Sequence, residues 1–159
     1  FLIINIPNMA NKESKSQSPN VKFLINAQYL KDISFENPKA PNSLKKFSEN
    51  PKIQVDVDVK SKPLNQEGNN IFEVELIIKA ETKSDEESLF IVEATYCGIF
   101  TIENAKDELL DKILLIECPK FLFPFLRSTL AFCTREGGFP PLMISPVDFA
   151  TMYEQKKVK

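Results

Sequence analysis

The residues from Cys118 to Tyr153 constrain the fold more than any other part of the chain. Pro124 fits the first turn of a helix, because its missing N–H is not needed there. Gly137 and Gly138 end that helix, since glycine accepts the left-handed backbone of a C-terminal cap. Between these points apolar residues cover nearly the whole circumference, so the helix needs cover from more than one neighbour. In a chain of 159 residues, a second copy of the protein can be one of these neighbours.

The spacing of the apolar residues divides the predicted helix into two faces. Leu126, Leu130 and Cys133 are three and four apart and share a buried face, whereas Phe125 and Phe132 lie on another. We expect these five residues to form the interface of an obligate oligomer, a tetramer. An extended, proline-fixed loop follows, and then a second helix that Ser145 and Asp148 open in a capping-box pattern.

Alternation of apolar and polar residues with period two predicts four strands before these helices. The first runs from Val21 to Glu36, with Val21, Ala27 and Tyr29 on the apolar side and a bulge near Leu30, where the alternation falters. The others contain residues 53–59, 72–80 and 90–96, the last with a bulge at Gly98. Strands joined by turns are most economically antiparallel, and one apolar face calls for helices on that side only. The sequence therefore predicts an α+β fold, a four-stranded antiparallel sheet with helices packed on one face.

The remaining segments complete a single domain over residues 21–159. Residues 1–20 are polar over most of their length and are predicted to be a mobile N-terminal segment; the initial FLIINIP lacks a basic flank and is a poor signal peptide. Residues 36–51 contain three prolines and must cross the surface as a loop. Residues 104–117 read as a helix capped by Asn104, which should bend or break at Cys118-Pro119.

Composition excludes several classes of function. The chain has no histidine, which removes the commonest general base and metal ligand. The three cysteines, at 97, 118 and 133, have no metal-type spacing and read as reduced thiols of a cytoplasmic protein. A net charge of −2 argues against nucleic acid, and no apolar run is long enough for membrane insertion. We therefore predict neither catalytic residues nor a metal or other cofactor.

The chain contains thirteen phenylalanines, more than one small core readily consumes. Several apolar residues fall in loops and in the last helix, where they either anchor loops to the core or line an apolar groove. Methionine and flexible loops suit recognition of varied apolar partners. The groove residues predicted on this basis are Leu44, Phe47, Phe139, Leu142, Phe149, Met152 and Tyr153.

Four segments resemble the SecB family of protein-export chaperones: LKDISFENPKAP, CGIFTI, CPKFLFPFLR and GGFPPLMISPVDF. Each is weak alone, but their common order from about Val21 to Tyr153 is specific. The resemblance implies a homotetramer, a dimer of dimers, that holds secretory precursors unfolded without ATP. It also implies delivery of these precursors to the export motor SecA. The lysine-rich end of this chain departs from the longer or more acidic tails of many members.

Alternation and resemblance agree on one surface. Val92, Ala94 and Tyr96 share the buried parity, so Ile91 and Glu93 point to the other face. On the first strand, the polar parity carries two further carboxylates. In the SecB family, residues at the matching positions dock the zinc-bearing tail of SecA; here they are Asp32, Glu36, Ile91 and Glu93.

Two other classes of function stay open at this point. The first is a small carrier that binds an apolar ligand between helix and sheet, with one ligand per chain and no affinity for unfolded proteins. The second is an enzyme without histidine, which no residue pattern suggests. A holdase would instead bind many reduced, unfolded chains and suppress their aggregation.

Overall fold

The fold is built on one four-stranded antiparallel sheet, as predicted. The computed structural model describes residues 20–46, 51–64, 68 and 70–158; the predicted mobile segment lies almost wholly outside them. The strands have the spatial order β1-β4-β3-β2. They are β1 (Lys22–Glu36), β2 (Lys52–Pro63), β3 (Ile71–Ser84) and β4 (Glu87–Glu103). The loop from β1 to β2 must therefore pass from one edge of the sheet to the other.

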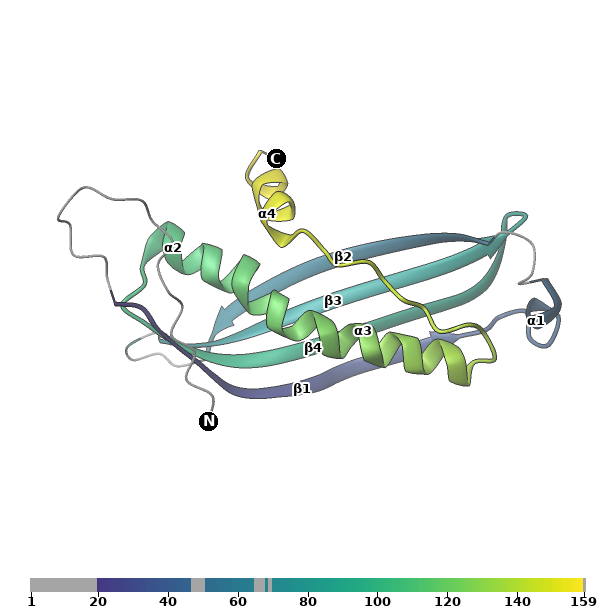
Figure 1. Ribbon diagram of the computed structural model, residues 1–159, viewed down its shortest axis with the longest axis horizontal. Helices are drawn as coiled ribbons and strands as arrows, with labels where there is room; N and C mark the ends of the chain where they lie inside the picture. Colours follow the sequence, from purple (N-terminus) through teal and green to yellow (C-terminus); the bar gives the residue numbers. More distant parts are fainter. Residues whose placement is uncertain (1–19, 47–50, 65–67, 69, 159) are drawn as a thin grey trace.

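One long helix covers one face of this sheet (Figure 1). It comprises α2 (Asp107–Lys112), the π-helical turn η1 (Ile113–Glu117) and α3 (Cys118–Glu136). The predicted break at Cys118-Pro119 does not occur, and Pro124 lies inside α3 rather than in a first turn. Asn104 does not cap the helix, because Lys106 precedes its first residue and Asn104 has a φ of 63°.

The inner side of α3 forms the core with β3 and β4. Leu122, Leu126 and Leu130 are fully buried. Gly98 makes this contact possible, since a Cβ there would lie 2.5 Å from the Phe100 ring and 2.9 Å from Leu122 Cδ2. The predicted bulge at Gly98 is wrong, because the pairing of β4 with both of its neighbours is regular at this residue.

Strand β1 contains two bulges where the sequence predicted one. The predicted irregularity lies between Leu30 and Asp32, and a second lies between Ile25 and Ala27. Each inserts one residue and so reverses which side chains face the helix. Ala27 and Tyr29 therefore lie opposite Ile99 and Cys97 on the sheet face away from α3, hereafter the outer face. Their predicted place on the apolar side is wrong.

The chain after α3 returns along the helix side of the sheet (Figure 1). Gly138, with a φ of 87°, takes the left-handed cap conformation, whereas Gly137 stays helical. An extended strap (residues 139–148) leads to α4 (Phe149–Lys157). Asp148 caps α4 by accepting from the Thr151 N–H at 3.0 Å, so the predicted capping role of Ser145 is wrong. The loop after β1 contains a short helix, α1 (Ser43–Lys46).

Candidate functional site

The four residues predicted to contact SecA lie together on the outer face. In the β1–β4 register Glu36 pairs with Ile91, and Ser34 pairs with Glu93. Asp32 lies opposite Thr95, the next outer-face position of β4. Asp32 and Glu36 are exposed, whereas Ile91 and Glu93 are half-buried. Three carboxylates and one apolar side chain thus follow one another along the β1–β4 pair on the outer face; their binding role stays a prediction.

The neighbouring strand β3 adds charges of both signs to this surface. Lys79 pairs in register with Glu93, and Glu81 pairs with Ile91. The Glu81 carboxylate also lies 3.4 Å from the Lys83 ammonium. The unbalanced negative charge is therefore concentrated on the β1 side of this surface, where Asp32 and Glu36 form no ion pair among the described residues.

The predicted groove residues fall into two groups on the helix side. At the C-terminal end of α3, Phe139 packs on Phe90 and Phe35, with ring centroids 4.8 and 6.4 Å apart. Leu44 from α1 approaches this end at Gly138 and remains exposed. Phe47 lies outside the described residues.

The second group surrounds α4. Phe149 packs edge-on against Phe123 at 6.3 Å, and Met152 and Tyr153 line a hollow beneath the helix. Leu142 lies in the strap between the two groups and is buried, as are Phe139, Phe149 and Tyr153. These buried residues anchor the strap and α4 to the core, while Leu44 and Met152 retain accessible surface. Client binding by the set stays a prediction.

The residues predicted to form the oligomer interface separate into the two expected faces of α3. Leu126 and Leu130 are fully buried against the chain's own sheet, so they leave no surface for a second copy, which corrects their assignment. Cys133 is half-buried. Phe125 and Phe132 are 51% and 55% exposed. Phe125 also stacks on Tyr96 of β4, with ring centroids 5.9 Å apart.

Two β1 residues near this exposed aromatic surface were not predicted. Between the two bulges, Gln28 and Leu30 lie opposite Gly98 and Tyr96, on the helix side of the sheet. Leu30 is exposed, and the buried Gln28 Oε1 has no hydrogen-bond partner among the described residues. Their position depends on the bulge between Ile25 and Ala27, which the alternation of the sequence does not indicate. They extend the surface around Phe125 to the free edge of β1.

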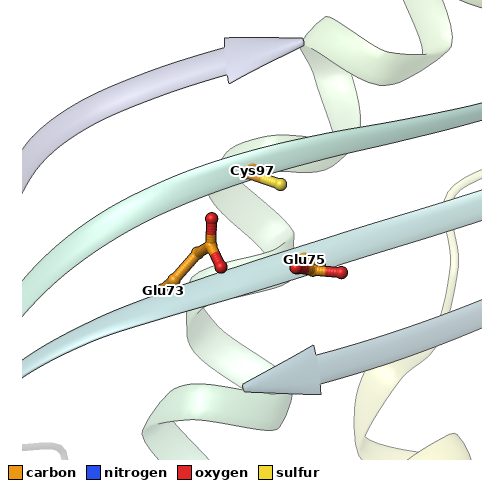
Figure 2. A group of neighbouring side chains, drawn as sticks. All are labelled: Glu73, Glu75 and Cys97. Carbon is orange, nitrogen blue, oxygen red and sulfur yellow. The ribbon is translucent and has the colours of Figure 1, made fainter. Parts of the chain in front are cut away.

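A polar cluster occupies the middle of the outer face (Figure 2). Glu73, Glu75 and Cys97 have ligand-type atoms within 4.8 Å of one another. However, the Lys62 ammonium lies 2.6 Å from Glu73 Oε2, and Lys31 pairs with Glu75. These ammonium groups already supply the positive charge that a metal ion would bring.

The ionisation of the cluster agrees with this pairing. Hydrogen bonds from Lys62 and from the Tyr29 hydroxyl lower the pKa of Glu73 to about 2. Burial, together with the nearby Glu75 and Glu73, raises the pKa of the Cys97 thiol to about 11. The carboxylate is therefore charged and the thiol protonated at neutral pH, which favours an ion-pair network over metal ligation.

Comparison with known proteins decides the family. The sequence model of the SecB family, described as preprotein translocase subunit SecB, matches residues 15–159. The chain belongs to the SecB family. Proteins of the SecB family are export chaperones rather than enzymes. Among the described residues, no helix is long and apolar enough to cross a membrane.

Several relatives of this SecB-family chain are named protein-export protein SecB. That of Maricaulis maris is 42% identical over 153 residues, covering 96% of this chain and 86% of the relative. That of Mesorhizobium japonicum is 48% identical over 130 residues, covering 82% and 76%. A solved SecB-like chaperone of Mycobacterium tuberculosis, in complex with a ChAD peptide from an antitoxin, shares the fold. Its TM-score is 0.66 at 13% identity, covering 79% of this chain and 90% of that one.

Proposed function

We propose that this SecB-family chain is a cytoplasmic holdase that keeps secretory precursors unfolded and delivers them to SecA. The observation that carries the proposal is the family relationship, which extends over 96% of the chain in one relative named protein-export protein SecB. Holding a client needs accessible apolar surface and delivery needs a separate partner surface. The described chain offers candidates for both, on opposite faces of one sheet.

The client surface lies on the helix side. Exposed or half-buried apolar residues, including Leu44 and Met152, border the strap and α4 there. A solved SecB-like chaperone of the same fold binds a peptide. Burial of apolar client side chains contributes roughly 25 cal/mol per Å² to the free energy of binding. This contribution suffices for reversible binding of a client without ATP.

The SecA surface lies on the outer face, around Asp32, Glu36, Ile91 and Glu93. Carboxylates attract and orient a basic partner, and the apolar Ile91 among them provides a contact that salt does not screen. Because this surface and the client surface are on opposite faces, one partner does not block the other.

We propose a homotetramer, a dimer of dimers, as the working state. Phe125 and Phe132 expose large rings along α3, and Leu30 and the unpartnered Gln28 Oε1 continue that surface on β1. Large exposed apolar patches in soluble proteins mark association surfaces. A second copy would cover the rings and offer a donor to Gln28.

Light scattering of a slowly refolding precursor tests the holdase proposal. With this protein present, aggregation should fall in proportion to its concentration, and unrelated reduced, unfolded proteins should compete. The same precursor in its folded state serves as the control and should not compete. Unchanged aggregation at an excess of this protein would contradict the proposal. Binding of one small apolar ligand per chain, without affinity for unfolded protein, would favour a carrier instead.

A further inference from the structure

The second bulge of β1 leaves Lys31 without an opposite residue. Leu30 lies opposite Tyr96 and Asp32 opposite Thr95, so residues two apart on β1 face consecutive residues of β4. An extra residue of this kind changes the direction of the side chains around it, and bulges often serve to aim one of them. Here the side chain that follows the extra residue is one of the three carboxylates of the proposed SecA surface.

The position of the bulge decides the face on which Asp32 lies. If the pairing of Leu30 continued without the extra residue, Asp32 would lie opposite Ala94. Ala94 is fully buried on the helix side, and a carboxylate there would lose its hydration. The bulge at Lys31 moves Asp32 on by one position and so places it on the outer face.

The Lys31 side chain is anchored beyond the neighbouring strand. Its ammonium pairs with the Glu75 carboxylate of β3 and lies 3.7 Å from Glu73 Oε2. Because β4 separates β1 from β3, the lysine side chain crosses β4 to reach them. The hydrogen bond with Glu75 raises the pKa of Lys31, so the ion pair is present at neutral pH. This ion pair therefore ties the bulged residue to the body of the sheet.

The anchor also draws a positive charge away from the acidic surface. Glu75 pairs in register with Cys97 of β4. Cys97 lies two residues from Thr95, the partner of Asp32, in the direction away from Glu93. A lysine ammonium that was free beside Asp32 would attract its carboxylate and reduce the negative charge offered to a basic partner. Asp32 instead stays exposed with its full charge.

We propose that Lys31 is a positioning residue of the SecA surface: its ion pair with Glu75 fixes the bulge, and the bulge aims Asp32 at the partner. This inference rests on the proposed function, since it explains how one residue of the proposed SecA surface obtains its position. Lys31 acts through Asp32 and not through its own charge. A lysine that contributed only its charge would repel a basic partner and weaken its binding.

The variant Lys31→Met distinguishes positioning from charge, because the two roles predict changes of opposite sign. The substitution makes the net charge more negative by one, which alone should strengthen the binding of a basic partner. We expect instead that the Kd for purified SecA, measured by calorimetry at low salt, rises about 2- to 5-fold, the worth of one exposed charge contact. The variant should fold, because Lys62 lies 4.0 Å from Glu75 and still balances it.

Three further variants test the route through Asp32. Lys31→Arg keeps a cation that can reach Glu75 and should bind SecA like the wild type. Lys22→Met removes another exposed lysine of β1, paired with Glu103 at 3.0 Å at the far end of the strand, and should not raise the Kd. In an Asp32→Asn background, Lys31→Met should cause no further change, since both act on one contact.

The outcomes separate this inference from the proposed function. If the wild type does not bind SecA at low salt, the proposed delivery fails and this inference with it. If the wild type binds SecA but Lys31→Met binds it with unchanged or greater affinity, only the inference is overturned. A merely structural lysine would lower the melting temperature without a change in Kd, which would overturn it as well. A further rise of the Kd in the Asp32→Asn background would exclude the route through Asp32.

Discussion

Glu73 is a carboxylate buried on the outer face of the sheet, the face opposite the long helix. It is 5% exposed and accepts from Lys62 of β2 and Tyr29 of β1, while its own strand is β3. One side chain thereby links three strands. A paired buried charge contributes little on balance, but removal of one member leaves the other uncompensated. The cluster should therefore respond strongly to substitution and to pH.

Acid should destabilise the fold through Glu73. The folded-state pKa of Glu73 is about 2, below the ordinary value of 4.5. The charged carboxylate therefore stabilises the fold, and this stabilisation is fully present above about pH 4.5. This contribution is lost as the pH falls from about 4.5 towards 2. We expect Glu73→Gln to lower the free energy of unfolding at pH 7 by on the order of 3 kcal/mol and to flatten its slope over that window. Urea denaturation at several pH values measures both.

The control for this prediction is Glu136→Gln. Glu136 is exposed, and among the described residues it pairs only with the adjacent Arg135, at 3.2 Å, a type of pair that contributes at most about 1 kcal/mol. Its substitution should leave the acid slope as in the wild type. An unchanged slope in Glu73→Gln would contradict the assigned role of Glu73.

Thr134 anchors the strap to the long helix. Its hydroxyl is buried, accepts from the Leu142 N–H at 2.9 Å and lies 3.1 Å from the Leu130 carbonyl oxygen. Thr134→Val keeps the shape but orphans the Leu142 N–H, so we expect a loss of about 1–3 kcal/mol in the free energy of unfolding and faster proteolysis of the strap. Thr129→Val is the matched control, because in the part of the chain that the structure describes the Thr129 hydroxyl donates only to the Phe125 carbonyl oxygen. Equal losses in both variants would argue against an anchoring role.

At the scale of elements, the long helix continues through two prolines that favour a break. Pro119 is the second residue of α3, just after the π-helical turn, and Pro124 lies further inside α3. Each removes a backbone donor. Burial of Leu122, Leu126 and Leu130 against the sheet accounts for the continuity, since packing of an apolar face outweighs local propensity. Sequence rules for helix ends describe only the local free-energy cost of a proline and not the gain from packing against the sheet.

The contact between α3 and β4 depends on Gly98. In Gly98→Ala the new methyl group would lie 2.5 Å from the Phe100 ring and 2.9 Å from Leu122 Cδ2. Overpacking of this kind typically costs about 1–3 kcal/mol, so the midpoint of thermal unfolding should fall by several degrees. No loss of stability in Gly98→Ala would show that the helix shifts freely to accommodate the methyl group.

Alternation predicted β2, β3 and β4 well because the apolar residues of each strand point to the helix side, although Ile53 at the start of β2 remains exposed. It failed in the middle of β1, where the bulge at Asn26 does not interrupt the alternation of the sequence. Ala27 and Tyr29 are tolerated on either face of a sheet, so their residue types do not reveal the reversal. The second bulge, after Leu30, restores the original phase. Asp32 and Glu36 therefore lie on the predicted face although the strand between is reversed. The groove and the interface depend on how the strap and α3 pack, which periodicity does not encode.

At the scale of the molecule, exposed aromatic rings on α3 predict self-association. Phe125 and Phe132 project away from the chain's own core, so Phe125→Asp with Phe132→Asp should dissociate the oligomer by burying charge at its interface. Analytical ultracentrifugation at micromolar concentration measures the change. Gln54→Asp adds a charge at an exposed position of β2, at the opposite edge of the sheet from β1, and should remain assembled. A stable wild-type monomer would contradict the predicted tetramer.

The outer face and its carboxylates predict how SecA binding should depend on charge. Asp32 is exposed and Glu93 lies nearby on the adjacent strand, so Asp32→Lys with Glu93→Lys reverses the field at one place. We expect SecA binding to be lost, with peptide binding and assembly retained, and wild-type binding to weaken steeply with salt. Glu154→Lys with Glu136→Lys changes the net charge equally at exposed carboxylates of α4 and α3, on the helix side of the sheet, and should bind SecA nearly normally. Calorimetry at low salt compares the two double variants. Equal affinities would show that net charge, rather than this surface, attracts SecA.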